Sequence, residues 1–329
     1  MTANSADLDL GKIVLTVGDW PPEAWIDHLG RLVPREDIIF SDGTAPPPAD
    51  VCDKVKYAVA WKTPDGFFGN FPNLKAVLST GAGVDHLVGR ADLPPEVAIL
   101  RINDLDLTGR VTAWTVMNVI AHHRQALAYL DAQQRADWKP LSQSSAPDVR
   151  VGIMGYGALG QSAGDVLRLL GYDLAGWARS PKPDAPIKVY AGLDQLDAFL
   201  ARTDILVCLL PLTEQTEGIL NADLFGKLAQ DGVTGGPFVI NGGRGGHQDE
   251  DDLLAALVDG TLKGASIDVF HEEPLPADNP LWKAPNILIT PHTAGMSAPE
   301  ALLGQMVKNL IDFASGKEVD VLVDRSAGY

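Results

Sequence analysis

The stretch VGIMGYGALGQSAGDVLRLLG, residues 151–171, decides how this chain folds. A short apolar run leads into Gly155, Gly157 and Gly160, and a segment of helical periodicity follows and stops near Gly171. The pattern predicts a strand, a tight turn and a helix. In such a unit the first glycine permits the turn, the second lets a pyrophosphate approach the backbone, and the third permits close packing of the helix. We therefore expect dinucleotide binding, against the alternative of a turn that is merely rich in glycine.

Apolar runs and helical patterns alternate on both sides of this stretch, which predicts an α/β protein. Buried parallel strands are expected first at residues 12–17, 37–40, 57–61, 75–79 and 97–100. After a long helical stretch at 111–130, further strands are expected at 150–154, 173–178, 204–210, 237–241, 264–270 and 286–290. The expected fold is two Rossmann-like parallel-sheet domains, one flavodoxin-like and one NAD(P)-binding, with a cleft between them.

The chain has 329 residues and 46% hydrophobic composition, which makes two domains the natural expectation. A last helix is predicted over 299–314, after the last strand. This helix has no strand of its own to cover. We therefore expect this helix to return to the first domain. The expected boundaries are 1–104 plus 296–329 for a substrate domain and 105–295 for a Rossmann domain.

The composition argues against several classes of protein. The formal net charge is -17 at pH 7 and no run of Lys and Arg is present, which disfavours a nucleic-acid binder. Cys52 and Cys208 are the only cysteines, so no disulfide framework is expected and a reducing cytoplasm fits. No signal-peptide pattern and no run of about 18 apolar residues occurs, so no membrane partner is expected. Because the net charge is negative, any anionic substrate must be attracted by local positively charged side chains.

The choice of cofactor is read at the end of the strand after the glycine turn. A site for NAD places Asp or Glu there to accept hydrogen bonds from the ribose hydroxyls. Here the sequence is WARSPK, residues 177–182, without a carboxylate. Arg179 and Lys182 are suited to a 2′-phosphate, so NADP(H) is expected. NAD(H) is the alternative if both side chains are only solvated surface cations.

Three polar residues follow predicted strands of one sheet. Arg244 lies among glycines after the strand that ends at Asn241, where a guanidinium could hold a carboxylate and polarise a carbonyl. Glu273 and His292 also lie just past strand ends, where open α/β sheets bind ligands. A carboxylate beside an imidazole favours the protonated ring, which could deliver a proton near neutral pH.

The other histidines indicate no site. His122 and His123 fall on the predicted long helix, and His271 neighbours an acidic loop. His271 and Glu272 lack the ligand spacing of a metal motif, so no metal site is expected.

The motifs GxGxxG, NGGRG, DVFHEEPLP and TPH, in this order and spacing, resemble the D-isomer-specific 2-hydroxyacid dehydrogenase family. The resemblance covers nearly the whole chain. Within the family, WARSPK, EDDLLAALVDG, NPLW and LKAVLSTGAGVDHL are similar to the NADPH-dependent glyoxylate/hydroxypyruvate reductase A-like branch. The family's motif is written N-x-x-RG, and the extra glycine here is expected to loosen the loop that bears Arg244.

The resemblance implies roles for the catalytic residues. Arg244 would bind a 2-oxo acid and polarise its carbonyl, His292 would be the acid and base, and Glu273 would orient and charge His292. The expected cofactor contacts are Gly155, Tyr156, Gly157, Ala158, Leu159, Gly160, Ala178, Arg179, Ser180, Lys182, Leu210, Pro211, Asn241, Gly242 and Asp268.

The resemblance also implies further substrate contacts and a partner. The family holds the substrate carboxylate with loop amides, here those around Ala82, Gly83 and Val84 in STGAGVDHL. Trp61 matches a substrate-pocket tryptophan of the reductase branch. Trp138 resembles a tryptophan that reaches the active site of a partner subunit in a homodimer joined through the cofactor domains. For both tryptophans, ordinary packing is the alternative.

The sequence thus predicts NADPH-dependent reduction of a small 2-oxo acid, such as glyoxylate or hydroxypyruvate, to glycolate or D-glycerate. One alternative is a dehydrogenase for a bulkier 2-oxo acid, because the pocket lining comes from several loops and its volume is not written in the sequence. Another is a non-catalytic, dinucleotide-sensing partner protein, since the family's fold also serves as a corepressor. No added recognition segment is seen, which disfavours the sensor.

Overall fold

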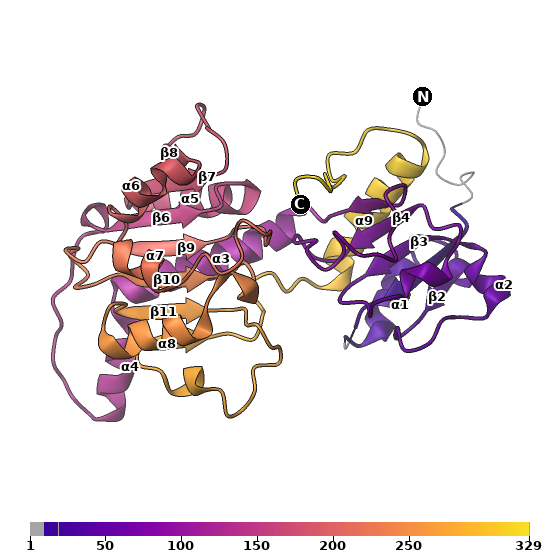
Figure 1. Ribbon diagram of the computed structural model, residues 1–329. Coiled ribbons are helices and arrows are strands. Elements are labelled where there is room, and N and C mark those ends of the chain that lie inside the picture. The colour runs from indigo at the N-terminus through magenta and orange to yellow at the C-terminus, as the bar shows by residue number, and fades with distance from the viewer. Residues whose placement is uncertain (1–9, 19, 329) are drawn as a thin grey trace. The chain divides into compact units, whose positions relative to one another are not determined.

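The computed structural model describes residues 10–18 and 20–328, and the chain divides into two compact units. Unit 1 comprises Met1–Leu107 and Ser297–Tyr329, and unit 2 comprises Thr108–Met296. Each unit has one parallel sheet with helices packed on it (Figure 1). The predicted α/β class with two parallel-sheet domains is confirmed.

The sheet of unit 1 has five parallel strands in the order β2-β1-β3-β4-β5, which is the order of flavodoxin-like folds. Its central strands are almost wholly buried, because helices cover both faces of a parallel sheet, and this explains their unbroken apolar runs. Helix α9, Pro299–Ala314, has the predicted bounds and packs against α1. The elements are β1 Lys12–Thr16, α1 Pro22–Leu29, β2 Ile38–Phe40, α2 Ala49–Cys52, β3 Val55–Ala60, β4 Ala76–Ser79, β5 Ala98–Leu100 and α9.

The sheet of unit 2 has seven parallel strands in the order β12-β11-β10-β9-β6-β7-β8. From β8 to β11 this is the order of the Rossmann dinucleotide-binding fold, and β12 adds a seventh strand. The elements are α3 Leu105–His123, of which residues 108–123 belong to unit 2, α4 Ala126–Gln134, β6 Arg150–Met154, α5 Ala158–Leu169, β7 Asp173–Ala178, β8 Lys188–Ala191, α6 Leu196–Leu200, β9 Ile205–Cys208, α7 Ala222–Lys227, β10 Phe238–Asn241, α8 Glu250–Asp259, β11 Gly264–Ile267 and β12 Ile287–Ile289.

The structure differs from the prediction at one helix and adds one strand. The single helix expected at 111–130 is two helices, α3 and α4, because Gln125 has a φ of 57° that a continuous helix does not contain. Strand β8 is absent from the sequence prediction. It is an edge strand whose side chains are exposed or half-exposed, and its apolar run, VYA, is only three residues long.

Apolar residues continue past the ends of β9 and β11, and the sequence therefore predicts these strands too long. Leu209 and Leu210 follow β9, while Val269 and Phe270 follow β11, and all four are buried. Burial of a side chain does not require that its backbone stay in the sheet. These buried residues begin the loops that carry the candidate site.

His122 and His123 are buried polar residues of α3. The Nε2 of His122 lies 2.8 Å from Ser266 Oγ, and the Nδ1 of His123 lies 2.8 Å from the Tyr172 hydroxyl. Burial lowers the pKa of His122 from 6.5 to about 4. The unfolded chain therefore binds a proton at a pH where the folded chain does not. The stability that this residue contributes is complete above pH 6.5 and is lost as the pH falls toward 4.

We expect His122→Asn, which keeps a polar side chain but does not titrate, to reduce this acid sensitivity. Between about pH 7 and pH 5, the native protein should lose about 2 kcal/mol more unfolding free energy than the variant. Urea unfolding at both pH values measures the difference. Equal losses in the two proteins would contradict the assignment.

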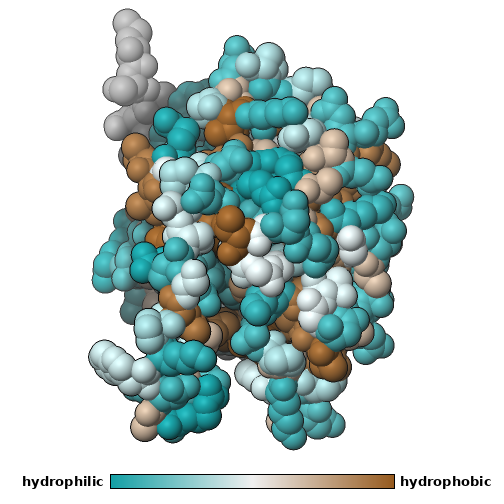
Figure 2. Space-filling view, turned by 90° about the vertical axis from the view of Figure 1, so that its left-hand side faces the viewer, coloured by the Kyte–Doolittle hydropathy of each residue, from teal (hydrophilic) through white to brown (hydrophobic). Residues whose placement is uncertain are grey.

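The surface mixes hydrophobic and hydrophilic side chains, and both cysteines are buried. On the face shown in Figure 2, hydrophobic residues form separate patches among hydrophilic ones. Within residues 10–18 and 20–328, no helix has the length and apolarity to span a bilayer. In the same residues, no three His, Cys, Asp or Glu side chains gather as metal ligands. Cys52 and Cys208 are buried free thiols, and burial raises the pKa of Cys208 to about 12.

Candidate active site

The strand order of unit 2 places the candidate segments side by side along one edge of its sheet. The strands β7, β6, β9, β10, β11 and β12 are consecutive neighbours, all parallel. The carboxyl ends of parallel strands meet at the edge where open α/β sheets bind ligands. In that order, the segments after these strands carry Arg179, the turn 155–160, Leu210 with Pro211, Arg244, Asp268 with Glu273, and His292.

The three glycines of the turn differ in what surrounds them. Gly155 has a φ of 94°, and a Cβ there would lie 2.6 Å from the carbonyl oxygen of Leu209. A Cβ on Gly160 would overlap the carbonyl oxygen of Gly155. A Cβ on Gly157 would meet nothing within 4 Å, and this residue immediately precedes α5. Open space therefore lies where helix N-terminal amides can face an anion, and the turn fits a dinucleotide pyrophosphate.

The side chain of Tyr156 is part of the core. It is 1% exposed, and a Cβ on Gly176 would lie 2.9 Å from its ring. A cofactor could therefore contact Tyr156 through its backbone.

The end of β7 is tied to the glycine turn. The amides of Gly155 and Tyr156 donate to the carbonyl oxygen of Trp177, at 3.0 and 3.3 Å. The strand then leaves the core, because Ala178 is buried while Arg179 and Lys182 are exposed. Two cations therefore follow directly on the strand that holds the turn.

The loop that bears Arg244 is held firmly. The side chain of Asn241 accepts a hydrogen bond from the Gly243 amide at 3.0 Å and donates to the Arg244 carbonyl oxygen at 3.1 Å. The Arg244 amide donates to His247 Nδ1 at 3.0 Å, and a Cβ on Gly243 would lie 2.9 Å from that ring. The expectation that the extra glycine loosens this loop is wrong, because the glycines are required by close packing.

Glu273 and His292 are brought together as predicted from their places after β11 and β12. His292 Nδ1 lies 2.8 Å from Glu273 Oε2, and both side chains remain partly exposed. The other oxygen of Glu273 accepts a hydrogen bond from the Phe270 amide at 3.1 Å. The carboxylate therefore fixes the Nδ1 side of the His292 ring.

The Arg244 loop also contacts the segment that holds Glu273. Gly245 lies so close to the carbonyl group of Phe270 that a Cβ would overlap it. The same Phe270 donates its amide hydrogen to Glu273. One continuous set of contacts in unit 2 thus connects Arg244, Glu273 and His292.

Asp268 organises the turn that carries His292. This carboxylate is 1% exposed and accepts hydrogen bonds from the Thr290 hydroxyl at 2.5 Å and from the amides of Thr293 and Ala294, both at 2.9 Å. Its carbonyl oxygen accepts the His292 amide at 2.7 Å, and His292 has a φ of 53°. Burial raises the pKa of Asp268, and these hydrogen bonds oppose the rise. Thr290 has no role in the sequence prediction, although it is the first residue of the TPH motif.

The predicted substrate residues of unit 1 lie at the carboxyl edge of its own sheet. Trp61 follows β3, and the loop with Ala82, Gly83 and Val84 follows the neighbouring strand β4. The Trp61 ring packs directly on Gly81, so tryptophan and loop are in contact. Val84 is buried, whereas Ala82 and Gly83 are half-buried.

Trp138 is 99% exposed. Ordinary packing within the chain, the alternative for this residue, is therefore wrong. A tryptophan in this position is available to another molecule.

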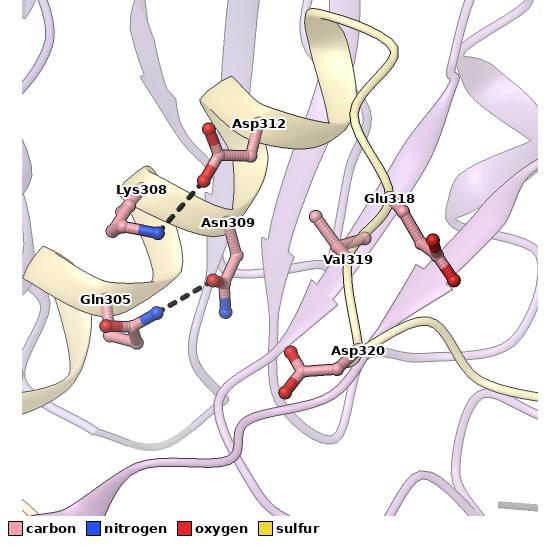
Figure 3. Close-up of a pocket in the computed structure, with 7 residues that line it drawn as sticks. All are labelled: Gln305, Lys308, Asn309, Asp312, Glu318, Val319 and Asp320. Carbon is pink, nitrogen blue, oxygen red and sulfur yellow. Dashed lines mark hydrogen bonds and ion pairs between the residues drawn. The ribbon is translucent and has the colours of Figure 1, made fainter.

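One cavity in unit 1 contains none of the predicted site residues. Figure 3 shows this cavity of about 490 Å³, where α9 faces the segment 318–320. Asp312 on its wall is paired with Lys308 at 2.9 Å and with Lys317 at 2.6 Å. Two lysines thus already neutralise Asp312, and we assign the cavity no function.

Comparison with known proteins identifies the family. Residues 116–294 match the family model of the D-isomer specific 2-hydroxyacid dehydrogenase, NAD binding domain. Glyoxylate/hydroxypyruvate reductase A of Serratia proteamaculans is 35% identical over 312 residues, which cover 93% of this chain and 96% of the relative.

Solved structures agree with this match. An NADPH-dependent glyoxylate/hydroxypyruvate reductase from Sinorhizobium meliloti, in complex with NADP and sulfate, has a TM-score of 0.89 and 41% identity, covering 97% of this chain and 100% of that one. A probable 2-hydroxyacid dehydrogenase from Rhizobium etli, in complex with NADP, HEPES and L(+)-tartaric acid, has a TM-score of 0.88 and 39% identity, with the same coverage. The chain, as its motifs indicate, belongs to the D-isomer specific 2-hydroxyacid dehydrogenase family.

Proposed function

We propose that this protein is an NADPH-dependent reductase of small 2-oxo acids, which converts glyoxylate to glycolate and hydroxypyruvate to D-glycerate. The observation that carries the proposal is the Glu273–His292 pair at 2.8 Å, on the sheet edge that also bears the glycine turn and Arg244. Relatives that match this chain over 93% or more of its length bear the name glyoxylate/hydroxypyruvate reductase. The protein is accordingly an oxidoreductase that uses NADP(H).

The residues of the chain divide the work of reduction. When bound, the reduced nicotinamide supplies a hydride to the carbonyl carbon. Arg244 binds the substrate carboxylate and polarises the carbonyl oxygen, since a guanidinium presents several donors in one plane. His292 gives its Nε2 proton to that oxygen, and Glu273 holds the ring at Nδ1 and stabilises its charged form. One hydride and one proton thus convert the 2-oxo group to a hydroxyl.

Cofactor contacts follow from the same edge. Gly157 and the first turn of α5 would hold the pyrophosphate, and Arg179 with Lys182 would hold the 2′-phosphate. In unit 1, the amides around Ala82 and Gly83 would hold the substrate carboxylate, with Trp61 packed beside them.

We expect Arg179→Ala to raise the KM for NADPH by about 10- to 100-fold, because a charged hydrogen bond to the 2′-phosphate is lost. The KM for NADH should stay within about twofold, since NADH lacks that phosphate. Arg168→Ala is the matched control, because Arg168 is a half-exposed cation on α5 of the same unit. Equal changes in KM for both cofactors would show that Arg179 does not read the phosphate.

We expect Glu273→Gln to lower kcat/KM for reduction by about 10-fold. The amide keeps a hydrogen bond to His292 but removes the negative charge that supports the ring as the proton donor. Steady-state rates with hydroxypyruvate measure this loss. An unchanged kcat/KM would mean that the charge of Glu273 does not support His292.

Initial rates of NADPH oxidation with glyoxylate, hydroxypyruvate, pyruvate and phenylpyruvate test the substrate class. The proposal expects the fastest turnover with the first two. Fastest turnover with phenylpyruvate would favour a dehydrogenase for bulkier 2-oxo acids. Tight NADPH binding without turnover on any of them would favour a dinucleotide sensor.

The exposed hydrophobic residues of unit 2 fit a homodimer joined through this unit. We propose that the homodimer acts in the cytoplasm. Large exposed hydrophobic side chains gather on α3, α4 and the loop after them: Met117, Ile120, Tyr129, Leu130 and Trp138. Covering them by a second copy would remove apolar surface from water. Light scattering of native protein and of Trp138→Glu tests this, with a dimer expected only for the former. A monomeric native protein would refute the dimer.

A further inference from the structure

Trp114 of α3 contacts two candidate catalytic segments at once. It is 8% exposed, and its indole Nε1 donates a hydrogen bond of 3.0 Å to the Thr290 hydroxyl, 176 positions away in the chain. At the opposite edge of the same ring, a Cβ on Gly242 would lie 2.8 Å from Cζ3 and 3.3 Å from Cε3. The six-membered ring therefore packs on the backbone of the NGGRG loop, while the five-membered ring holds the TPH motif.

The contact with Thr290 connects Trp114 to the turn that carries His292, because Thr290 is also hydrogen-bonded to Asp268. The Thr290 hydroxyl accepts from Trp114 and can then give its own hydrogen to Asp268 Oδ1, at 2.5 Å. The indole therefore sets which direction that hydroxyl donates, because Nε1 is a donor only. Asp268 in turn accepts the amides of the turn and, at its carbonyl oxygen, the His292 amide at 2.7 Å. The chain Trp114–Thr290–Asp268 ends on the backbone of the proposed acid.

The contact with Gly242 connects Trp114 to Arg244, because Gly242 and Gly243 precede Arg244 in a loop held by hydrogen bonds. The Gly242 amide is fixed to the Cys208 carbonyl oxygen at 3.1 Å, and the Gly243 amide is fixed to Asn241 at 3.0 Å. With no side chain at position 242, the loop backbone can lie directly on the ring. A shift of the indole would therefore move the base of the Arg244 loop.

We propose that Trp114 is a positioning residue that sets the distance between the Arg244 loop and the His292 turn. A rigid planar ring with one contact at each edge acts as a spacer between the two segments. The inference rests on the proposed function, since it concerns the geometry in which Arg244 and His292 act on one substrate. Misplacement of reacting groups by about 1 Å can cost about 10²-fold in rate.

One variant of Trp114 and one of Thr290 test the hydrogen bond between these residues. Trp114→Phe keeps an aromatic ring but removes the indole donor and the ring width, and Thr290→Val keeps the shape of threonine but removes its hydroxyl. Each should lower kcat with NADPH and hydroxypyruvate by about 10-fold, while both KM values stay within about threefold. Thr290→Ser retains the hydroxyl and should keep kcat within about threefold of the native value.

The double variant distinguishes positioning from a general loss of structure. Because both substitutions break the same chain, Trp114→Phe with Thr290→Val should be no more than about twofold slower than the slower single variant. Trp282→Phe is the matched control: its indole donates a comparable hydrogen bond to the Pro276 carbonyl oxygen at 2.9 Å, and it is not part of the Trp114–Thr290–Asp268 chain. This variant should keep the native kcat.

The outcomes separate the inference from the proposed function. An active native enzyme with kcat of Trp114→Phe within about twofold of native overturns the inference alone. Single losses that multiply in the double variant do the same. If Trp114→Phe does not fold, as circular dichroism would show, the contrast between Thr290→Val and Thr290→Ser decides, and equal rates for these two overturn the inference. A native protein that reduces no 2-oxo acid overturns the proposed function and this inference with it.

Discussion

His292→Asn lowers kcat/KM for the reduction of glyoxylate and hydroxypyruvate by about 10²- to 10⁴-fold, the range that general acid catalysis contributes. Asparagine keeps a polar group at this position but has no proton to transfer near neutral pH. Steady-state kinetics with both substrates measures the loss.

His271→Asn is the control for this prediction. His271 lies on the same segment as Glu273, and its Nε2 lies 2.6 Å from the Gln248 carbonyl oxygen, so it takes part in no proposed step. It should keep kcat/KM within about threefold of native. A His292→Asn enzyme of near-native rate would remove the proton donor from the mechanism.

Arg244→Ala is expected to have an effect of comparable size. Loss of one donor to a developing oxyanion costs about 10²- to 10³-fold, and Arg244 is also proposed to bind the carboxylate. The KM for the 2-oxo acid should therefore rise while kcat falls, and the dissociation constant of NADPH should change little. Arg244→Lys should recover only part of the loss, because an ammonium does not reproduce the planar fork. Full activity of the lysine variant would contradict a bidentate role.

The sequence predicts the edge of unit 2 well because its signals are local and chemical. The turn 155–160 needs glycine where a Cβ would overlap backbone, and such a need is written directly in the residue types. Glu273 and His292 lie just past the ends of β11 and β12, and parallel strands bring such residues to one edge whatever the separation in sequence. Motif and topology therefore lead to the same pair.

What the sequence does not predict depends on contacts between distant residues. Trp114 and Thr290 are 176 positions apart, and neither carries a pattern that names the other. The break at Gln125 is a single backbone angle within a stretch whose apolar pattern suits one helix. Gly243 looks like a source of freedom in the sequence, but it packs against His247 in the structure. Each requires knowledge of which side chain fills which space.

The most direct test of the central claim follows the hydride itself. The native protein is incubated with hydroxypyruvate and NADPH carrying deuterium at the transferred position of the nicotinamide, and the glycerate formed is analysed by mass spectrometry and chiral chromatography. The account predicts D-glycerate with one deuterium on its second carbon. NADPH oxidation without deuterium in the product, or glycerate of the L configuration, would contradict it.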